Sequence, residues 1–241
     1  PLRRSFNAEH MEALDSIRPS VVSFHFGLPQ DLSWVSQLQK WGIHVWSSAT
    51  TVEEAIYLEQ VGKVDAIIAQ GLEAGGHRGM FLEKDLTRQE ELETLLPHIR
   101  SHVRIPVIAA GGCTRSPSRW FGLGASAIQV GSCFLLTQEA KISSVYRQSL
   151  ENEEETCLTN IFTGKPARGL RNRFINEVGP LSTHTCGFPH TGNAVFPLRL
   201  AAEAKHKNDF TPLWRGQFFD RDLSRLSAGN IVRELNAEID L

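Results

Sequence analysis

The sequence predicts an α/β fold in which parallel strands form a (β/α)8 barrel of the TIM-barrel type, with a smaller lobe attached. Three observations predict it: short apolar runs rich in β-branched residues, helix patterns between those runs, and glycine or polar residues directly after them. Alternation of strands and helices along a chain indicates a parallel sheet. The chain has 241 residues, of which 41% are hydrophobic, and this length suits one large domain or a domain with a smaller lobe.

The predicted strands are nearly continuous apolar runs, which is typical of parallel strands covered on both faces. They are Val21–Gly27, Ile43–Ala49, Asp65–Gly71, Ile105–Gly112 and Ser126–Ser132. An open doubly wound sheet and a (β/α)8 barrel both accommodate five such strands. The barrel is favoured because most of these strands end in glycine-rich or polar residues, and barrel enzymes assemble their sites from such loops.

Helix patterns fill the intervals between the predicted strands. Thr51 and Glu54 stand at the spacing of a capping box and predict the start of one helix. Thr87 and Glu90 repeat that spacing, which predicts that another helix begins at Thr87. Shorter helices are expected at residues 29–40 and 116–123.

The strand–helix rhythm stops after residue 134, where the composition shifts toward Arg, Asn, Thr, Gly and Pro. We expect residues 1–134 to form the βα units of the barrel. Residues 135–212 are expected to form a smaller lobe of loops and short helices that covers the site. Residues 213–241 are expected to return to the barrel as a C-terminal amphipathic helix.

Composition excludes several classes of protein. A net charge of −2 gives no electrostatic reason to expect binding to nucleic acid or to a membrane surface. The apolar runs are shorter than the ~20 residues of a spanning helix, and no charged-then-apolar leader opens the chain, so a cytoplasmic location is expected. The four cysteines are widely spread without a C-x-x-C pair, so we expect free thiols and neither a metal site nor a disulfide framework.

The segment "QGLEAGGHRG", Gln70–Gly79, holds the first group of candidate site residues. An ordinary turn needs one or two glycines, whereas this loop has four and places His77 among them. A neutral imidazole accepts a proton near physiological pH, which suits His77 to a general base; the alternative is a tight turn whose histidine caps a helix. Gln70 can bond the edge of a heterocycle or simply end a strand. His25 is a second histidine that can line the same pocket.

Two later loops suit a phosphate group. Gly111 and Gly112 follow one predicted strand, and Gly131 and Ser132 follow the next. Glycines let the backbone approach an anion closely, and consecutive strands late in a barrel commonly form its phosphate site. Simple turn glycines are the alternative interpretation. Neither G-x-x-x-x-G-K-[ST] nor a G-x-G-x-x-G after a strand is present, so a P-loop and a Rossmann fingerprint are excluded.

With these residues in view, the chain resembles the nitronate monooxygenase family, also called 2-nitropropane dioxygenases. The resemblance rests on motifs that run in the family's order over most of the chain. They are "AQGLEAGGHRG", "PVIAAGG", "GASAIQVGSCFLLTQEA", "FTGKPARGLRNRF" and "PLWRGQ".

The resemblance implies an FMN-dependent (β/α)8 barrel that uses O₂ to oxidise alkyl nitronates to carbonyl compounds and nitrite. His77 matches the family's catalytic histidine, acting as base on a neutral nitroalkane or helping to bind the anionic nitronate. Carried over by motif, the residues that contact FMN near its ring are Gln70 and Gly75, and those that hold its phosphate are Gly112, Gln129, Val130, Gly131 and Ser132.

The chain departs from the family pattern at its beginning. Members begin with an apolar strand and a Pro-Met loop beside the flavin, and none of this is present, so we expect an N-terminally truncated barrel that lacks about three of its eight strands. Two alternative functions stay open. One is an NAD(P)H-dependent FMN reductase of quinones or enoyl thioesters, and the other is an inactive flavin-barrel remnant. The physiological nitronate and the oligomeric state are not indicated by the sequence.

Overall fold

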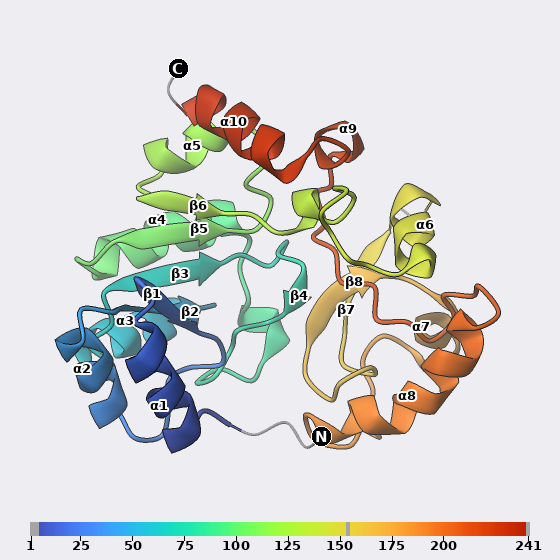
Figure 1. Cartoon of the computed structure of the whole chain (residues 1–241), viewed down its shortest axis with the longest axis horizontal. Coiled ribbons are helices and arrows are strands. Elements are labelled where there is room, and N and C mark those ends of the chain that lie inside the picture. Colours follow the sequence, from blue (N-terminus) through green and yellow to red (C-terminus); the bar gives the residue numbers. More distant parts are fainter. Residues whose placement is uncertain (1–4, 153–154, 240–241) are drawn as a thin grey trace. The chain divides into compact units, whose positions relative to one another are not determined.

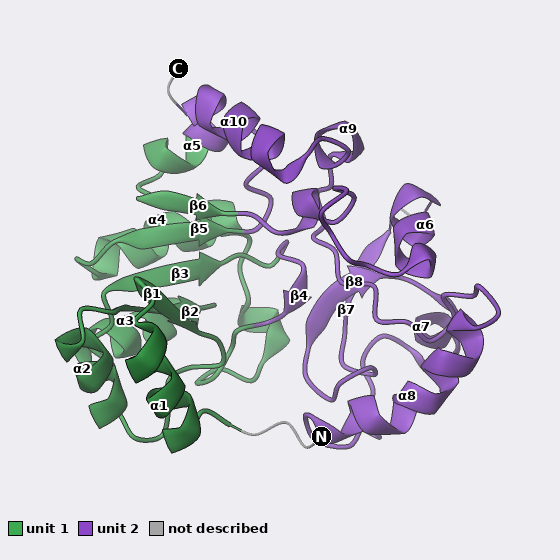
Figure 2. Cartoon of the chain, viewed as in Figure 1, with its two compact units in different colours: residues 1–72, 79–110, 119–129 green, residues 73–78, 111–118, 130–241 purple. Residues whose placement is uncertain are grey.

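The computed structural model describes residues 5–152 and 155–239, and the chain divides into two compact units, each of which is described by itself (Figure 2). Unit 1 comprises residues 1–72, 79–110 and 119–129. Unit 2 comprises residues 73–78, 111–118 and 130–241. The domain boundaries expected after residues 134 and 212 stay predictions.

Unit 1 is built on a parallel sheet whose five strands follow one another in chain order (Figure 1). The strands are β1 (Val21–Phe24), β2 (His44–Ala49), β3 (Ala66–Gln70), β5 (Val107–Ala110) and β6 (Ala127–Gln129). A doubly wound sheet reverses its strand order at a switch point, and these strands show no reversal. The predicted α/β fold of incomplete barrel type is therefore confirmed, with a sheet that runs from β1 to β6 without closing among the described residues.

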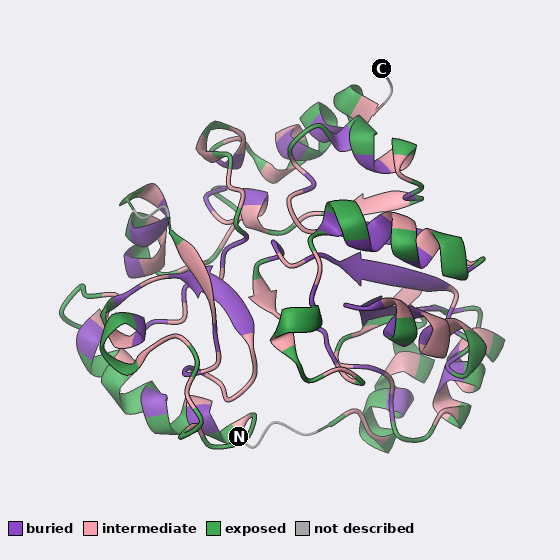
Figure 3. Cartoon of the chain, turned by 180° about the vertical axis from the view of Figure 1, so that it is seen from behind, coloured by how far each residue is buried: buried purple, intermediate pink, exposed green. Residues whose placement is uncertain are grey.

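The core of unit 1 lies on both faces of the central strands. Every residue of β3 and β5 is buried, as Figure 3 shows for this part of the sheet. On one face Ala66, Ile68, Ile108 and Ala110 form a single apolar cluster. Side chains alternate along a strand, so Ile67 and its neighbours on β5 face the opposite side, where they are equally buried. This two-sided burial explains why the strands read as continuous apolar runs.

Helices alternate with the strands of the sheet. They are α1 (Ala8–Ile17), α2 (Ser33–Lys40), α3 (Val52–Gln60), α4 (Leu92–His102) and α5 (Pro117–Gly122). The predicted cap of α3 is confirmed, because the Thr51 side chain accepts a hydrogen bond from the backbone N–H of Glu54.

The expected helix start at Thr87 is wrong. Residues Leu86–Arg88 form a short 3₁₀ turn, η1, and α4 begins only at Leu92. The reason is a competing cap: Asp85 Oδ1 accepts hydrogen bonds from the backbone N–H of Thr87 at 2.9 Å and from its hydroxyl at 2.8 Å. The Thr87 hydroxyl is thus donated to Asp85 and does not cap a helix.

Glu54 has a larger role than the capping box predicts. Its carboxylate is fully buried and does not reach back to the cap residue. One oxygen accepts hydrogen bonds from the backbone N–H and hydroxyl of Thr50, at 2.7 and 2.8 Å. The other accepts from the backbone N–H groups of Phe81 and Leu82, at 2.6 and 3.0 Å. Glu54 therefore fixes to α3 the segment that follows the glycine-rich loop.

Unit 2 contains a small antiparallel sheet in the order β4-β8-β7, which the sequence did not predict. Its strands are β4 (Gly76–His77), β7 (Thr156–Thr159) and β8 (Ala167–Leu170). The remaining elements of the unit are η2 (Ser132–Phe134), α6 (Ser144–Asn152), α7 (Arg173–Val178), α8 (His190–Glu203), α9 (Arg221–Ser224) and α10 (Ala228–Ile239). The expected C-terminal helix is thus present as α10, preceded by the short α9.

Two apolar clusters hold unit 2 together around its sheet. Leu136, Leu150, Leu170 and Leu213 form one of them. The other joins α7 and α8 to the connection between β7 and β8, through Ile161, Phe162, Ile175 and Val195. These clusters support β8, and β8 in turn pairs with β4, the strand that carries His77.

All four cysteines are free, and burial raises the pKa of Cys113 to about 12 and that of Cys133 to about 11. Within residues 5–152 and 155–239, no helix is both long enough and apolar enough to cross a membrane.

Candidate active site

The carboxyl ends of three neighbouring strands in unit 1 are aligned in register. Gln70 at the end of β3 pairs with Ala110 at the end of β5, and Ala110 pairs with Gln129 at the end of β6. After these ends the chain enters the three segments of unit 2, which are residues 73–78, 111–118 and 130–241. The three loops in which the sequence places the site therefore all start from one edge of one sheet, as barrel enzymes require.

Gln70 joins the two ends of the glycine-rich loop within unit 1. Its side chain is buried, and Oε1 accepts a hydrogen bond from the backbone N–H of Gly79 at 2.7 Å. His25 lies beside Gly79. If Gly79 carried a Cβ atom, that atom would be 2.8 Å from Cε1 of His25. The Nδ1 atom of His25 lies 3.0 Å from Ser48 Oγ. Both side chains are thus set at the strand ends of unit 1, and their contacts to a flavin stay predictions.

Gly75 allows a close approach of two backbone segments within unit 2. A Cβ on Gly75 would stand 2.4 Å from the backbone nitrogen of Gly216 and 2.6 Å from the carbonyl carbon of Arg215. Beside this contact, the backbone N–H of Gln217 donates to the carbonyl of Glu73 at 2.9 Å. The loop 73–78 is therefore packed directly on the segment 215–217, and only glycine fits at its closest point.

His77 is held in unit 2 by strand pairing, by a hydroxyl and by two aromatic rings. It belongs to β4, where it pairs with Ala167 of β8. Its Nε2 atom lies 2.9 Å from Thr163 Oγ1. The ring centroids of Trp214 and Phe188 lie 5.4 and 5.7 Å from the imidazole centroid. The imidazole is thus oriented by contacts from several parts of the chain, which is the arrangement that a general base needs.

The two predicted phosphate loops contact one short segment of unit 2. The hydroxyl oxygen of Ser132 accepts a hydrogen bond from the backbone N–H of Gly216 at 2.8 Å. A Cβ on Gly112 would stand 2.8 Å from the ring of Phe218. Because Gly216 and Phe218 are two residues apart, both loops lie next to the same short segment, and their binding of a phosphate group stays a prediction.

The residues of these loops fit a phosphate group. Gly111 and Gly112 have φ of 122° and 65°, a backbone region that favours glycine and creates concave arrangements of N–H donors. Gly131 has no atom within 4 Å of an added Cβ, so its backbone is open to a ligand. Since Ser132 Oγ accepts from Gly216, its own hydroxyl hydrogen can be donated to an anion. The Val130 side chain packs against the apolar cluster of Cys133, Ile231 and Leu235. At this position the loop therefore presents its backbone to an anion.

Sequence reasoning missed three features of this site. Thr163 contacts His77, the segment 215–218 contacts all three loops, and Arg115 stacks its guanidinium 4.8 Å above the ring of Phe218. The motifs "FTGKPARG" and "PLWRGQ" contain the first two, and they served only as marks of family resemblance. Arg115 carries no motif signal, and it adds a positive charge to the loop that holds Gly112.

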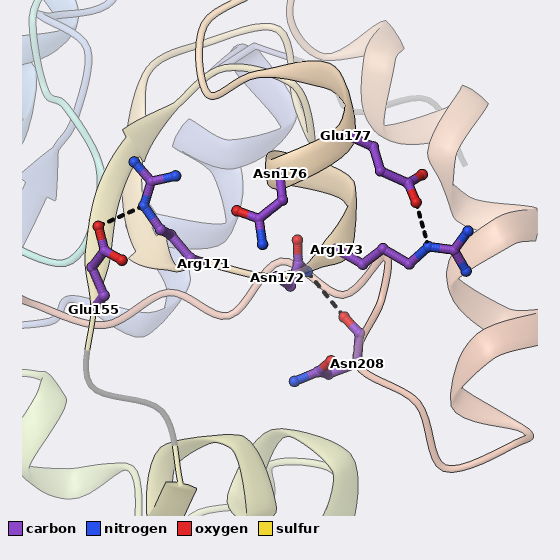
Figure 4. A pocket seen from close by; sticks show the side chains of 7 residues that line it. All are labelled: Glu155, Arg171, Asn172, Arg173, Asn176, Glu177 and Asn208. Carbon is purple, nitrogen blue, oxygen red and sulfur yellow. Dashed lines mark hydrogen bonds and ion pairs between the residues drawn. The ribbon is translucent and has the colours of Figure 1, made fainter.

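Unit 2 also contains a polar pocket, which is lined by residues other than the predicted site residues. It has a volume of about 570 Å³, and its walls are Glu155, Arg171, Asn172, Arg173, Asn176, Glu177 and Asn208 (Figure 4). Its charges are already balanced, because Arg171 pairs with Glu155 at 2.8 Å and Arg173 with Glu177 at 2.6 Å. None of the site residues predicted from the sequence lines it, so it contributes nothing to their chemistry.

Fold and candidate site together define the class: an α/β protein of barrel type in which glycine-rich loops follow parallel strands and one of these loops carries an oriented histidine. The comparison with known families is specific. The chain belongs to the nitronate monooxygenase family, whose profile matches residues 4–238.

Individual relatives agree with this assignment. A probable nitronate monooxygenase from Staphylococcus saprophyticus is 35% identical over 98% of this chain and 72% of its own length. A nitronate monooxygenase from Pseudomonas aeruginosa is 38% identical over 92% of this chain. The chain spans 64% of that relative and 63% of a Bacillus subtilis relative. The relatives are therefore longer proteins than the sequence described by this structure.

Solved structures give the same result. The crystal structure of nitroalkane oxidase from Streptomyces ansochromogenes superposes with a TM-score of 0.85 at 35% identity, over 95% of this chain and 67% of that one. FabK from Thermotoga maritima superposes with a TM-score of 0.73 at 23% identity, which shows a shared fold alone.

Gly75→Ala tests the close approach of the loop to residues 215–217. The added methyl group meets backbone atoms that cannot rotate away, so we expect a loss of stability of about 1–3 kcal/mol. The measurement is the free energy of unfolding in urea. Gly187→Ala is the matched control in the same unit, because an added Cβ there meets no atom within 4 Å. Equal stability of the two variants would contradict the packing described for Gly75.

Proposed function

We propose that this chain carries the flavin-dependent oxidation of alkyl nitronates by O₂ to carbonyl compounds and nitrite. Membership of the nitronate monooxygenase family supports the reaction class. The observation in the structure that carries the proposal is His77, which is oriented by a hydroxyl and two aromatic rings at the end of a glycine-rich loop. FabK supports only the fold, so the reductase alternative has no comparable observation in its favour.

Flavin dependence is a general property of the family, and we propose FMN as the particular flavin. Its phosphate would be held by Gly112, Val130, Gly131 and Ser132, which supply backbone donors, open space and a hydroxyl. Gln70, Gly75 and Gln129 would contact the rest of the cofactor from the strand ends and the loop. A bound flavin supplies the redox chemistry, while the protein supplies orientation and electrostatics.

The role proposed for His77 is to move a proton. A neutral nitroalkane must lose a proton from carbon before it becomes a nitronate, and an imidazole is a suitable acceptor at physiological pH. With an anionic nitronate, the same side chain would bind the negative charge after taking up a proton. Phe188 and Trp214 lie on the imidazole and present apolar surface for the alkyl part of the substrate.

Gly131→Val tests the phosphate site without disturbing the fold. The new side chain enters open space, and the φ of Gly131, −134°, lies outside the left-handed region that favours glycine. We expect an unchanged thermal midpoint and FMN affinity weaker by roughly 10- to 100-fold, because a valine at this place would obstruct the phosphate. The measurement is titration of the apoprotein with FMN, followed by flavin fluorescence.

Gly229→Val is the matched control for that titration. Gly229 also has open space around its added Cβ, and it lies in α10, outside the phosphate loops. Its FMN affinity is expected to equal that of the unaltered chain. If Gly131→Val bound FMN as tightly as this control, the phosphate would have to lie elsewhere.

His77→Gln tests the proton-transfer role. We expect turnover of neutral 2-nitropropane to fall by about 10²–10⁴-fold, and turnover of preformed propyl-2-nitronate to fall much less, because only the neutral substrate requires proton abstraction. Nitrite release is measured for both substrates. Equal losses would contradict the base role, and rapid reduction of the bound flavin by NADH would favour the reductase alternative.

A further inference from the structure

The hydroxyl of Thr163 has three polar contacts at once. His77 Nε2 lies 2.9 Å from Thr163 Oγ1. The same hydroxyl donates to the carbonyl of Lys165 at 3.2 Å, and it accepts from the backbone N–H of Lys165 at 3.3 Å. All of these residues belong to unit 2.

These contacts favour one position of the proton on the His77 ring. A threonine hydroxyl has a single hydrogen and accepts at its lone pairs. When that hydrogen goes to the Lys165 carbonyl, the contact with Nε2 can be a hydrogen bond only if Nε2–H is the donor. The three contacts can therefore exist together in one arrangement, in which the neutral imidazole is protonated at Nε2 and has its basic lone pair at Nδ1.

We propose that Thr163 is a positioning residue that holds His77 in this tautomer, so that Nδ1 is the atom that receives the substrate proton. The inference rests on the proposed function in so far as His77 acts as a base. In the step concerned, the C–H bond of the nitroalkane breaks, its electron pair stays on the substrate to form the nitronate, and the proton forms an N–H bond at Nδ1.

The fold keeps Thr163 in place by short-range constraints. It lies in the connection between β7 and β8, and β8 pairs directly with the strand of His77. The next residue, Gly164, has φ of 85° and donates its N–H to the carbonyl of Asn160 at 2.8 Å. A Cβ on Gly164 would meet the backbone oxygen of Cys186 at 2.2 Å, so the turn requires glycine.

The hydroxyl also favours the charged product of the step. When Nδ1 takes the proton, His77 becomes an imidazolium whose Nε2–H still points at Thr163 Oγ1. Hydrogen bonds from a charged donor are stronger than those from a neutral one, so the contact strengthens as the charge develops. Thr163 thus contributes to the proton transfer through His77, and we assign it no contact with the reacting carbon.

Nitrogen-15 NMR of the full chain with labelled histidine tests the tautomer without any turnover. The His77 resonances are identified by their loss in His77→Gln. At a pH where the ring is neutral, we expect the protonated-type signal from Nε2 and the pyridine-type signal from Nδ1. The opposite assignment, with the proton on Nδ1, would overturn the proposal.

Two substitutions separate the hydroxyl from the shape of the side chain. Thr163→Val removes the acceptor, and the ratio of the Nε2–H to the Nδ1–H form should fall roughly fivefold, the equivalent of one ordinary hydrogen bond of about 1 kcal/mol. Thr163→Ser keeps the hydroxyl and should keep the ratio. Thr183→Val, at an exposed position of the same unit, is the control and should change nothing. A ratio unchanged in Thr163→Val would contradict the role of Thr163.

A kinetic arm distinguishes failure of this inference from failure of the proposed function. Thr163→Val should slow turnover of neutral 2-nitropropane more than turnover of propyl-2-nitronate, and Thr163→Ser should restore it. If the NMR ratio shifts as expected while both substrates react at unaltered rates, the tautomer assignment stands and the base role of His77 is wrong.

Discussion

The parallel pairing of β3, β5 and β6 is the constraint on which the candidate site depends. Their ends at Gln70, Ala110 and Gln129 are in register, so the chain leaves the sheet three times from the same edge. Both faces of β3 and β5 are buried, and a slip by one residue would turn every side chain of a strand to the opposite face. The chemistry then lies in loops, which tolerate glycines and polar residues that the strands do not.

Unit 2 organises those loops around one short segment of the chain. Residues 215–218 contact the glycine-rich loop through Gly75, and they contact the phosphate loops through Gly112 and Ser132. Backbone atoms make most of these contacts, which explains why glycine is needed at the closest approaches. The same unit orients His77 through the hairpin of β7 and β8, by the contact with Thr163 and the pairing with β8. The proposed anion binding and the proposed proton transfer would therefore use separate parts of a single unit.

The sequence predicted what local patterns determine, and the remainder depends on long-range contacts. Continuous apolar runs identified all five strands of unit 1 and their parallel arrangement. The false helix start at Thr87 shows the limit of a local signal, because Asp85 caps the same residue from the other side. The pairing of β4 with β8 joins residues about 90 positions apart. A strand of two residues is too short to show a periodic pattern in the sequence. Thr163 was missed for the same reason, since its contact with His77 exists only after that pairing forms.

The visible absorption spectrum of the purified chain, recorded after addition of FMN and removal of excess flavin, shows whether these loops form an FMN site. Far-ultraviolet circular dichroism of the same sample shows that the chain is folded. We expect flavin bands at a ratio near one FMN per chain, shifted from those of free FMN by the protein environment. A folded chain that stays colourless after incubation with FMN would show that the loops form no FMN site and would support the interpretation of the chain as an inactive member of its family.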